Sequence, residues 1–453
     1  MTRSTHPVME IVRNGHCMGC GFCTLAYDDR PDGPAIRMKY DGQRDQFVPS
    51  VVNWQPGDDT GNLICPGATM DMPALANAVH GHEPSDPITG EVVAIRAGYA
   101  TDRTIRSTAA SGGVTTALLT YLFDKGEIDL AYCVCAGNAP TEAKGRIVRH
   151  RGELNQIHGS TYHPADFGAE LTQLVQGGGR FAFVGLPCEV AGLEMLKRKK
   201  PELAERHVLS IGLFCGGINA YGGIGYYLEG FGIPWDDVGE IDYRYGPWPG
   251  HIRLRRKSTG EQVSVPRIHG NSRWKILRYV VGFQGYWMLP RCRMCPDQIS
   301  DFADIAVGDP HLPRFRQRNG EGFSAIVTRT RRGEETIRRA IAAGYVAEEP
   351  LSREELVRSQ GYTLDNRRHC EAYGRVAPWF GLKYPNIKVY GALSRSVRFR
   401  HYKYAAVDLM KIALPKNKLL RCLYIPWQVF EYLFITFAPR VFVERLSRLL
   451  RNR

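Results

Sequence analysis

The pattern of hydrophobic positions divides the chain into three regions. Residues 1–90 show no long strand or helix pattern and predict a loop-rich segment. From residue 91 to about 350, short apolar runs typical of buried strands alternate with stretches whose apolar residues recur every three or four positions, as in helices. This alternation predicts an α/β core with a mixed or mostly parallel sheet and flanking helices. After about residue 380, an aromatic and basic tail predicts helices of a different kind.

The expected elements of the core are short. The expected strands are apolar runs, and they cover residues 92–99, 128–136, 181–184, 208–214, 304–308 and 323–330. The expected helices cover residues 114–122, 189–199 and 334–343. The charged run at 253–257 predicts a solvated edge strand, and most aromatic residues between 218 and 290 are expected in core and loop packing.

The net charge of +13 is concentrated in the tail. From Arg395 onward there are thirteen Lys and Arg against three Asp and Glu, so the body in front of the tail is nearly neutral. A nearly neutral body argues against a nucleic-acid-binding protein. Within the tail, residues 423–437 are aromatic and apolar, with interruptions at Pro426 and Glu431. This composition suits a helix lying on an anionic membrane surface, and the alternative is a helical pair packed on the body or on a partner subunit.

Twelve cysteines in 453 residues are too sparse for a disulfide scaffold, and several have the spacing of metal ligands. Residues 1–12 lack the apolar core of a signal peptide, and no apolar run of about 18 residues occurs. We therefore expect a cytoplasmic protein, with the tail as a means of peripheral contact with the inner face of a membrane.

Three cysteines near the N-terminus have the spacing of an iron–sulfur ligand loop. Cys17, Cys20 and Cys23 form a Cys-x-x-Cys-x-x-Cys run, which wraps three corners of a 4Fe–4S cluster, and glycines allow the tight backbone approach. A more distant cysteine before proline commonly supplies the fourth ligand, and Cys65 precedes Pro66. The sequence thus predicts a ferredoxin-like 4Fe–4S segment, with a zinc knuckle as the alternative.

Four further cysteines are expected to meet at one edge of the sheet. Cys188 and Cys215 each follow a predicted strand, and open α/β sheets place their sites at the carboxyl ends of parallel strands. Cys292 and Cys295 form a Cys-x-x-Cys-Pro turn, in which proline prevents a continuous helix. These four thiols predict a second 4Fe–4S cluster, and the alternative is that Cys188 and Cys215 are isolated or redox-active thiols.

The sequence around Ser111, Gly112 and Gly113 predicts the start of the helix at 114–122. Unpaired N–H groups and the helix dipole favour an anion at such a start, for example a dinucleotide pyrophosphate. A simple capped helix is the alternative, and there is no Gly-x-Gly-x-x-Gly fingerprint.

Together these segments resemble one family. Residues 106–116, 185–189, 212–217 and 292–309 are similar, in order and spacing, to the coenzyme F-420 hydrogenase/dehydrogenase beta-subunit family. That family also includes ferredoxin-dependent 7-hydroxymethyl chlorophyll a reductase and one type of divinyl chlorophyllide reductase. The resemblance covers roughly residues 10–345.

The resemblance implies one FAD beside one or two 4Fe–4S clusters, with a second redox molecule stacked on the flavin. It implies that the loop around Ser111, Gly112 and Gly113, with Thr115 and Thr116, holds FAD. It places Asp309 and the turn 158–162, including Ser160 and Tyr162, near the flavin. The four cysteines at 188, 215, 292 and 295 would hold the cluster nearest the flavin, and the Cys17 group an outer cluster that meets the electron donor.

The leading hypothesis is an iron–sulfur flavoprotein oxidoreductase that takes electrons from ferredoxin or a similar donor and reduces a small organic substrate. The alternatives are an oxidoreductase of the deazaflavin coenzyme F-420 and a non-catalytic relay subunit docked to a membrane complex. The expected organisation is an iron–sulfur segment at 1–90, an FAD-binding part at 91–175, a second part with the inner cluster at 176–350, and a basic helical tail at 380–453.

Overall fold

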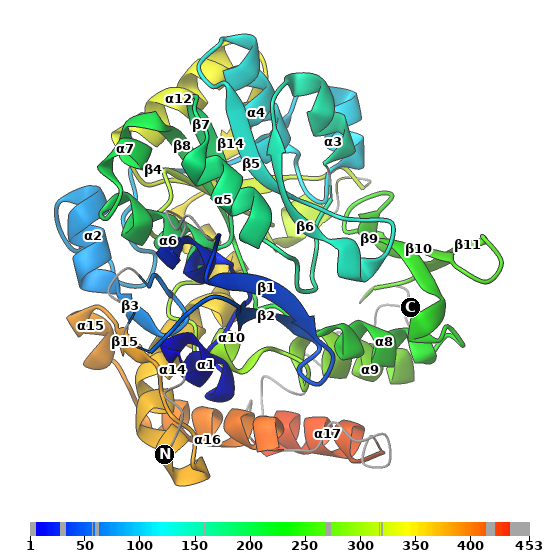
Figure 1. Ribbon diagram of the computed structural model, residues 1–453. Coiled ribbons are helices and arrows are strands. Elements are labelled where there is room, and N and C mark those ends of the chain that lie inside the picture. The colour runs from blue at the N-terminus through cyan, green and yellow to red at the C-terminus, as the bar shows by residue number, and fades with distance from the viewer. Residues whose placement is uncertain are drawn as a thin grey trace.

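An eight-stranded mixed sheet lies at the centre of the structure (Figure 1). The computed structural model describes residues 6–27, 33–56, 58, 63–157, 159–267, 273–316, 318, 320–413 and 422–434. The strand order is β14-β4-β13-β12-β8-β7-β5-β6, in which β12, β8, β7 and β5 are parallel neighbours and the outer pairs are antiparallel. The strands cover Ala94–Ala100 (β4), Leu130–Cys135 (β5), Lys144–Val148 (β6), Phe181–Gly185 (β7), His207–Leu213 (β8), Ile305–Gly308 (β12), Ser324–Thr328 (β13) and Val346–Pro350 (β14).

The predicted α/β class is confirmed, and each of the six predicted core strands lies in this sheet. The two strands that the pattern did not predict, β6 and β14, are the outermost ones. Both carry charged side chains at exposed or partly exposed positions. Edge strands of this kind lack the continuous apolar run by which buried parallel strands are recognised.

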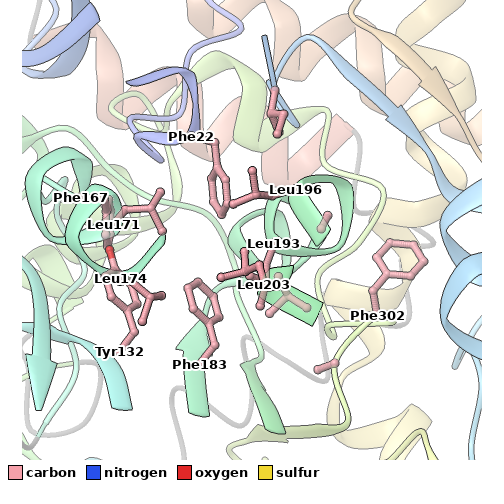
Figure 2. Packing of buried hydrophobic residues seen from close by; sticks show 14 of the residues in the cluster. Phe22, Tyr132, Phe167, Leu171, Leu174, Phe183, Leu193, Leu196, Leu203 and Phe302 are labelled. Carbon is pink, nitrogen blue, oxygen red and sulfur yellow. The ribbon is translucent and has the colours of Figure 1, made fainter. Parts of the chain in front are cut away.

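Helices cover both faces of the sheet because successive side chains of a strand point to opposite faces. In β7, Phe181 and Phe183 pack against helices on one side, where Figure 2 shows Phe183 near Leu193 and Leu203. Ala182 and Val184 belong to the core on the other face, which is covered by α4 and α12. The helices cover Pro7–Arg13 (α1), Met72–His80 (α2), Arg103–Thr108 (α3), Val114–Asp124 (α4), Gly168–Gln176 (α5), Pro187–Lys197 (α6), Pro201–Arg206 (α7), Tyr221–Glu229 (α8), Arg273–Gln284 (α9), Pro290–Arg293 (α10), Pro313–Arg316 (α11), Arg331–Ala342 (α12) and Arg353–Ser359 (α13).

Three smaller sheets surround the central one. The hairpin of β1 (Ile36–Asp41) and β2 (Gln46–Val51) lies in the N-terminal segment. The strands β9 (Val238–Tyr245), β10 (His251–Arg256) and β11 (Gln262–Val265) form a second sheet, and β3 (Thr69–Asp71) pairs in parallel with β15 (Asn386–Lys388). The edge-strand prediction at 253–257 is wrong: β10 is the middle strand of its sheet, with Ile252 and Leu254 buried beneath its charged side chains.

The C-terminal region is helical and packs on the body (Figure 1). It consists of α14 (Gly361–Val376), α15 (Gly391–Ser394), α16 (Phe399–Ala413) and α17 (Tyr424–Phe434). Tyr373 of α14 donates to Asp408 of α16 at 2.5 Å, and Tyr424 of α17 is buried beside Tyr286 and Trp287.

The predicted surface helix at 423–437 is described only as far as residue 434. There Tyr424 and Gln428 are buried, whereas Val429 and Phe430 are exposed. None of the described helices is long and apolar enough to cross a bilayer. Contact of this tail with a membrane stays a prediction.

Candidate functional site

A cavity of about 320 Å³ lies at the carboxyl ends of the parallel strands. Its wall is formed by residues that follow β5, β7, β8 and β12, together with the start of α4. Connections that leave neighbouring parallel strands meet at one edge of the sheet, so residues far apart in the sequence converge there.

The start of α4 forms a polar end of this cavity. Gly113 precedes the helix with φ 76°, a left-handed conformation that glycine adopts without strain. A Cβ atom on Gly112 would lie 2.6 Å from the carbonyl oxygen of Gly98, so this position accommodates only glycine. The hydroxyl of Ser111 donates to the carbonyl of Phe323, and the N–H of Gly112 donates to Ser324 Oγ at 3.1 Å. Strands β4 and β13 thereby fix this loop in position.

A buried arginine holds a second polar part of the cavity wall together. Arg244 Nη1 donates to Tyr162 Oη at 3.0 Å and to Asp309 Oδ2 at 2.9 Å, while Nε donates to the carbonyl of Pro249 at 3.0 Å. Burial would raise the pKa of Asp309, but the charges and hydrogen bonds of its neighbours, with Arg244 the strongest, together outweigh burial and lower the pKa to about 2. Among the described residues, no acceptor contacts the buried Nη2 atom of this cavity-lining arginine. Arg244 therefore retains one donor for a negatively charged or carbonyl group.

The outer cysteine set surrounds a second, small cavity. Cys17, Cys20, Cys23 and Cys65 all line this cavity of about 20 Å³. Burial raises the pKa of Cys17 to about 12, and the nearby Cys65 adds to the effect. Burial likewise raises the pKa of the other three thiols. Four buried thiols so close together are stabilised as thiolates only by strong positive charge, such as that of bound metal.

The inner cysteine set lines the main cavity. Cys188 lies in the first turn of α6, Cys215 follows β8, and Cys292 and Cys295 lie at and just beyond the end of α10. Burial raises the pKa of all four thiols, to about 11 for Cys295. The structure thus brings the two strand ends and the Cys-x-x-Cys turn together at one cavity, as expected.

The two cysteine sets are neighbours. Cys20 of the outer set lines both cavities, and its charge raises the pKa of Cys188 after the larger effects of burial and Glu189. Among the described residues, no three Cys, His, Asp or Glu side chains converge closely enough to hold a single metal ion. A four-iron cluster needs a wider arrangement, because each thiolate binds a different iron.

The other predicted site residues lie around the main cavity. All but Gly112 line it, namely Ser111, Gly113, Thr115, Thr116, Ser160, Tyr162 and Asp309. Gly112 lies behind the wall, against Gly98 and Ser324. His158, the first residue of the predicted turn 158–162, is outside the described residues.

Three ionisable residues of the site were not among the predicted functional residues. Arg244 is one of many charged residues in β9 and β10, and only the fold brings it to Asp309. Glu189 is buried beside Cys188 and accepts from the Leu186 N–H at 2.7 Å, and burial raises its pKa to about 7. Arg291 is fully buried and contacts loops of both cysteine sets. Hydrophobic patterning predicts such residues to be solvated, because charged side chains are rarely buried.

Comparison with known proteins identifies two matching family models. Residues 95–171 match the N-terminal model of the beta subunit of coenzyme F420 hydrogenase/dehydrogenase, and residues 178–354 match the C-terminal model. These matches cover more than half of the chain.

Similar curated proteins come from methanogenic archaea. The beta subunit of the coenzyme F420 hydrogenase of Methanosarcina barkeri is 22% identical over 271 residues, which is 59% of this chain and 84% of the relative. One subunit of the F(420)H(2) dehydrogenase of Methanosarcina mazei is 23% identical over 341 residues, with 72% of this chain and 83% of the relative covered. The coenzyme F420-dependent sulfite reductase of Methanocaldococcus jannaschii is 27% identical over 244 residues, with 49% of this chain and 33% of the relative covered.

One solved structure has the same fold. It is the F420-reducing [NiFe] hydrogenase complex from Methanosarcina barkeri, a chain of which superposes with a TM-score of 0.51 and 19% identity, covering 67% of this chain and 98% of that chain. The resemblance that the motifs predicted is thus confirmed by the family models, the curated relatives and the fold. This chain belongs to the coenzyme F420 hydrogenase/dehydrogenase beta-subunit family.

Proposed function

We propose that this protein is an iron–sulfur flavoprotein oxidoreductase. It passes electrons between a donor protein such as ferredoxin, two 4Fe–4S clusters, FAD and a small organic substrate. The observation that carries this proposal is that one four-cysteine set lines a cavity with a polar helix start, while the other set surrounds a neighbouring cavity and reaches the first at Cys20. Four-cysteine sets of this kind are typical ligands of 4Fe–4S clusters.

In this proposal the two cysteine sets have different positions relative to the substrate. Cys17, Cys20, Cys23 and Cys65 hold the outer cluster, away from the main cavity except at Cys20. Cys188, Cys215, Cys292 and Cys295 hold the inner cluster in the wall of the main cavity. In this arrangement electrons pass from the donor to the outer set, then to the inner set, and finally to the cavity.

The main cavity holds FAD and the substrate. Ser111, Gly112, Gly113, Thr115 and Thr116 bind FAD at the start of α4, where unpaired N–H groups suit its phosphates. Ser160, Tyr162 and Asp309 complete the flavin side of the cavity. When bound, FAD supplies the exchange between single electrons and electron pairs.

Arg244 favours ligands with a negatively charged or carbonyl oxygen in this part of the cavity. It carries a full positive charge, it is held rigidly by Tyr162, Asp309 and Pro249, and its Nη2 has no acceptor among the described residues. A charged donor in a buried site forms a strong hydrogen bond with an anionic or carbonyl oxygen. Arg244 thus orients the ligand that occupies this part of the cavity.

A direct test is anaerobic reconstitution followed by an iron count and a flavin assay. We expect about eight irons and about one FAD per chain, because two 4Fe–4S clusters contain that number. Four irons or fewer without FAD would reject the proposal.

A Cys17→Ser variant tests the division into two sets. It should lose the EPR signal of one cluster and retain the flavin. Cys135→Ser is a matched control, because Cys135 belongs to neither set and its thiol contacts the carbonyl of Ala136.

A second candidate for the organic reactant is coenzyme F420 itself. This candidate is favoured by the relatives, several of which are named as F420-dependent hydrogenase, dehydrogenase or sulfite reductase enzymes. An anaerobic absorbance assay with purified F420 and an artificial electron donor or acceptor tests this candidate. Turnover of F420 assigns it as a reactant, and absence of turnover rejects this candidate.

The non-catalytic relay is the remaining candidate. It is favoured by the hydrogenase complex from which the structural neighbour comes. Co-purification with a stoichiometric large partner, together with no turnover by the isolated chain, would support a relay role.

A further inference from the structure

Arg291 joins the loops of the two cysteine sets. Its Nε donates to the carbonyl of Gly67 at 2.8 Å and its Nη2 to the carbonyl of Pro66 at 3.1 Å, in the loop directly after Cys65. Its Nη1 donates to the carbonyl of Met294 at 3.2 Å, between Cys292 and Cys295. One side chain thus fixes the outer loop relative to the inner loop.

Arg291 differs from the other buried arginines of this region in its acceptors. Arg293 pairs with Asp408 at 2.6 Å, Arg367 with Asp301 at 2.6 Å, and Arg329 with Asp301 at 3.5 Å. Arg291 is 0% exposed, yet its acceptors are three neutral carbonyls, and within the described part of the chain it forms no ion pair with a carboxylate. A buried charge without a counter-charge is strongly unfavourable, so Arg291 favours a negatively charged group beside it.

The cysteine thiols are the groups that can supply this negative charge. The carbonyls that accept from Arg291 belong to Pro66 and Gly67, directly after Cys65, and to Met294, between Cys292 and Cys295. These thiols belong to both sets. Arg291 therefore acts electrostatically on each side of the boundary between the two sets.

We propose that Arg291 is the shared counter-cation of the two clusters and the brace that sets the separation of their loops. This inference rests on the proposed function, because it requires a thiolate-bound cluster in each set. A fixed buried cation favours the more negative, reduced state of a group beside it. Arg291 is thus a positioning residue that raises the reduction potential of both clusters together.

The test is an EPR-monitored redox titration of the reconstituted holoprotein. Arg291→Gln removes the charge, and we expect the ratio of reduced to oxidised cluster at a fixed potential to fall about tenfold for both clusters, which is about 59 mV for a one-electron couple. Arg291→Lys keeps the charge but cannot make all three hydrogen bonds. In this variant the ratio of reduced to oxidised cluster at that potential should stay within about threefold of the wild-type ratio. The magnetic interaction between the two reduced clusters should weaken.

The matched control is the double variant Arg293→Gln/Asp408→Asn. It removes a buried arginine from the same turn together with its counter-charge, so the net charge near the inner set is unchanged. We expect both potentials to remain as in wild type.

The outcomes separate this inference from the proposed function. A wild-type protein with four irons or fewer and no FAD rejects the proposed function, and four irons or fewer with FAD bound rejects any role for Arg291 between two clusters. Full iron content with unchanged potentials in Arg291→Gln, or a shift at only one cluster, rejects the shared role of Arg291 alone. If Arg291→Gln does not keep its iron, the result for Arg291→Lys decides. A tenfold fall of the reduced-to-oxidised ratio in Arg291→Lys contradicts the proposal. Loss of iron from both Arg291 variants, but not from the control, supports the role of Arg291 in holding the two loops together.

Discussion

Gly112 is enclosed by backbone atoms, which makes it a sensitive position of the cavity wall. A Cβ atom there would lie 2.6 Å from Gly98 O and 2.8 Å from Ser324 N, and neither backbone atom can move without distorting β4 or β13. We expect Gly112→Ala to lower the free energy of unfolding by about 1–3 kcal/mol, as overpacking does. Chemical denaturation measures this change.

Gly178→Ala is the control for that substitution, because no atom lies within 4 Å of the added Cβ. Its stability should remain close to that of wild type. Equal stabilities of the two variants would contradict the steric role of Gly112.

Arg244 contributes to both stability and binding, and the two effects can be separated. Arg244→Met leaves Asp309 buried without its partner, which costs about 3–5 kcal/mol of stability. Adding Asp309→Asn removes that buried charge and should restore most of the stability. The double variant should still bind FAD or F420 about tenfold more weakly, because a charged hydrogen bond from Nη2 is absent. Fluorescence titration with each ligand measures this effect, and unchanged affinity for both would contradict a ligand-binding role.

The sequence predicts the functional roles of some residues of the site but not of others. The spacing Cys17, Cys20, Cys23 indicates ligands without any structure, since three thiols at that interval lie on one short loop. Arg244 and Arg291 have no such local pattern. Their roles depend on contacts with Asp309 and with Gly67, far away in the sequence, which only the tertiary structure brings together.

At the scale of elements, α14 lies beyond the matched family models, which end at residue 354, yet it completes the loop of the inner set. Arg367 of α14 pairs with Asp301 at 2.6 Å and with Asp297 at 3.3 Å, and all three side chains are 0% exposed. Asp297 lies two residues after Cys295. The helix therefore fixes the backbone that carries this cysteine.

Arg367→Met should destabilise the protein by about 3–5 kcal/mol, because Asp297 and Asp301 lose their nearest buried cation and retain only the more distant charge of Arg329 among the described arginines. Iron bound by the inner set should fall more than iron bound by the outer set. Thermal unfolding and EPR of the reconstituted variant provide the two measurements.

Arg368→Met is the control on the same helix. Within the described part of the chain, the one ion pair of Arg368 is with the partly exposed Asp365 of the same helix, so its loss should cost about 1 kcal/mol or less. If the two variants behaved alike, α14 would have no special role at the inner set.

Among the strands, the six inner strands of the central sheet were predictable, whereas its edge strands β6 and β14 and the middle position of β10 were not. Strand β7 has five consecutive buried residues, a pattern with few alternatives. Strand β10 shows a charged surface on one side and Ile252 and Leu254 on the other, so its sequence does not reveal that strands flank it on both sides. The pairing of β3 with β15 joins segments about which local patterns carry no information.

At the scale of the whole molecule, buried histidines make stability depend on pH. Burial lowers the pKa of His163 and of His207 to about 3, and of His369 to about 4. The unfolded chain therefore binds more protons than the folded chain below the ordinary histidine pKa of about 6.5. Each of these histidines lowers stability by up to about 1.4 kcal/mol per pH unit as the pH falls from about 6.5 towards its folded pKa.

His163→Gln tests this pH dependence. Urea unfolding at several pH values between about 5 and 7.5 should show a slope of stability against pH that is smaller by up to about 1.4 kcal/mol per unit. The exposed His251→Gln should keep the wild-type slope. A slope unchanged by His163→Gln would mean that this histidine is not held neutral by burial.

The pairing of β3 with β15 also has a consequence for synthesis on the ribosome. Cys17, Cys20, Cys23 and Cys65 are made early, but the loop after Cys65 is held by Arg291 and continued by β3, which pairs with β15 near residue 387. His16 likewise contacts the carbonyl of Lys383 at 2.9 Å. Most of the chain must leave the ribosome before these partners exist, so the first thiols to be translated are among the last to be enclosed.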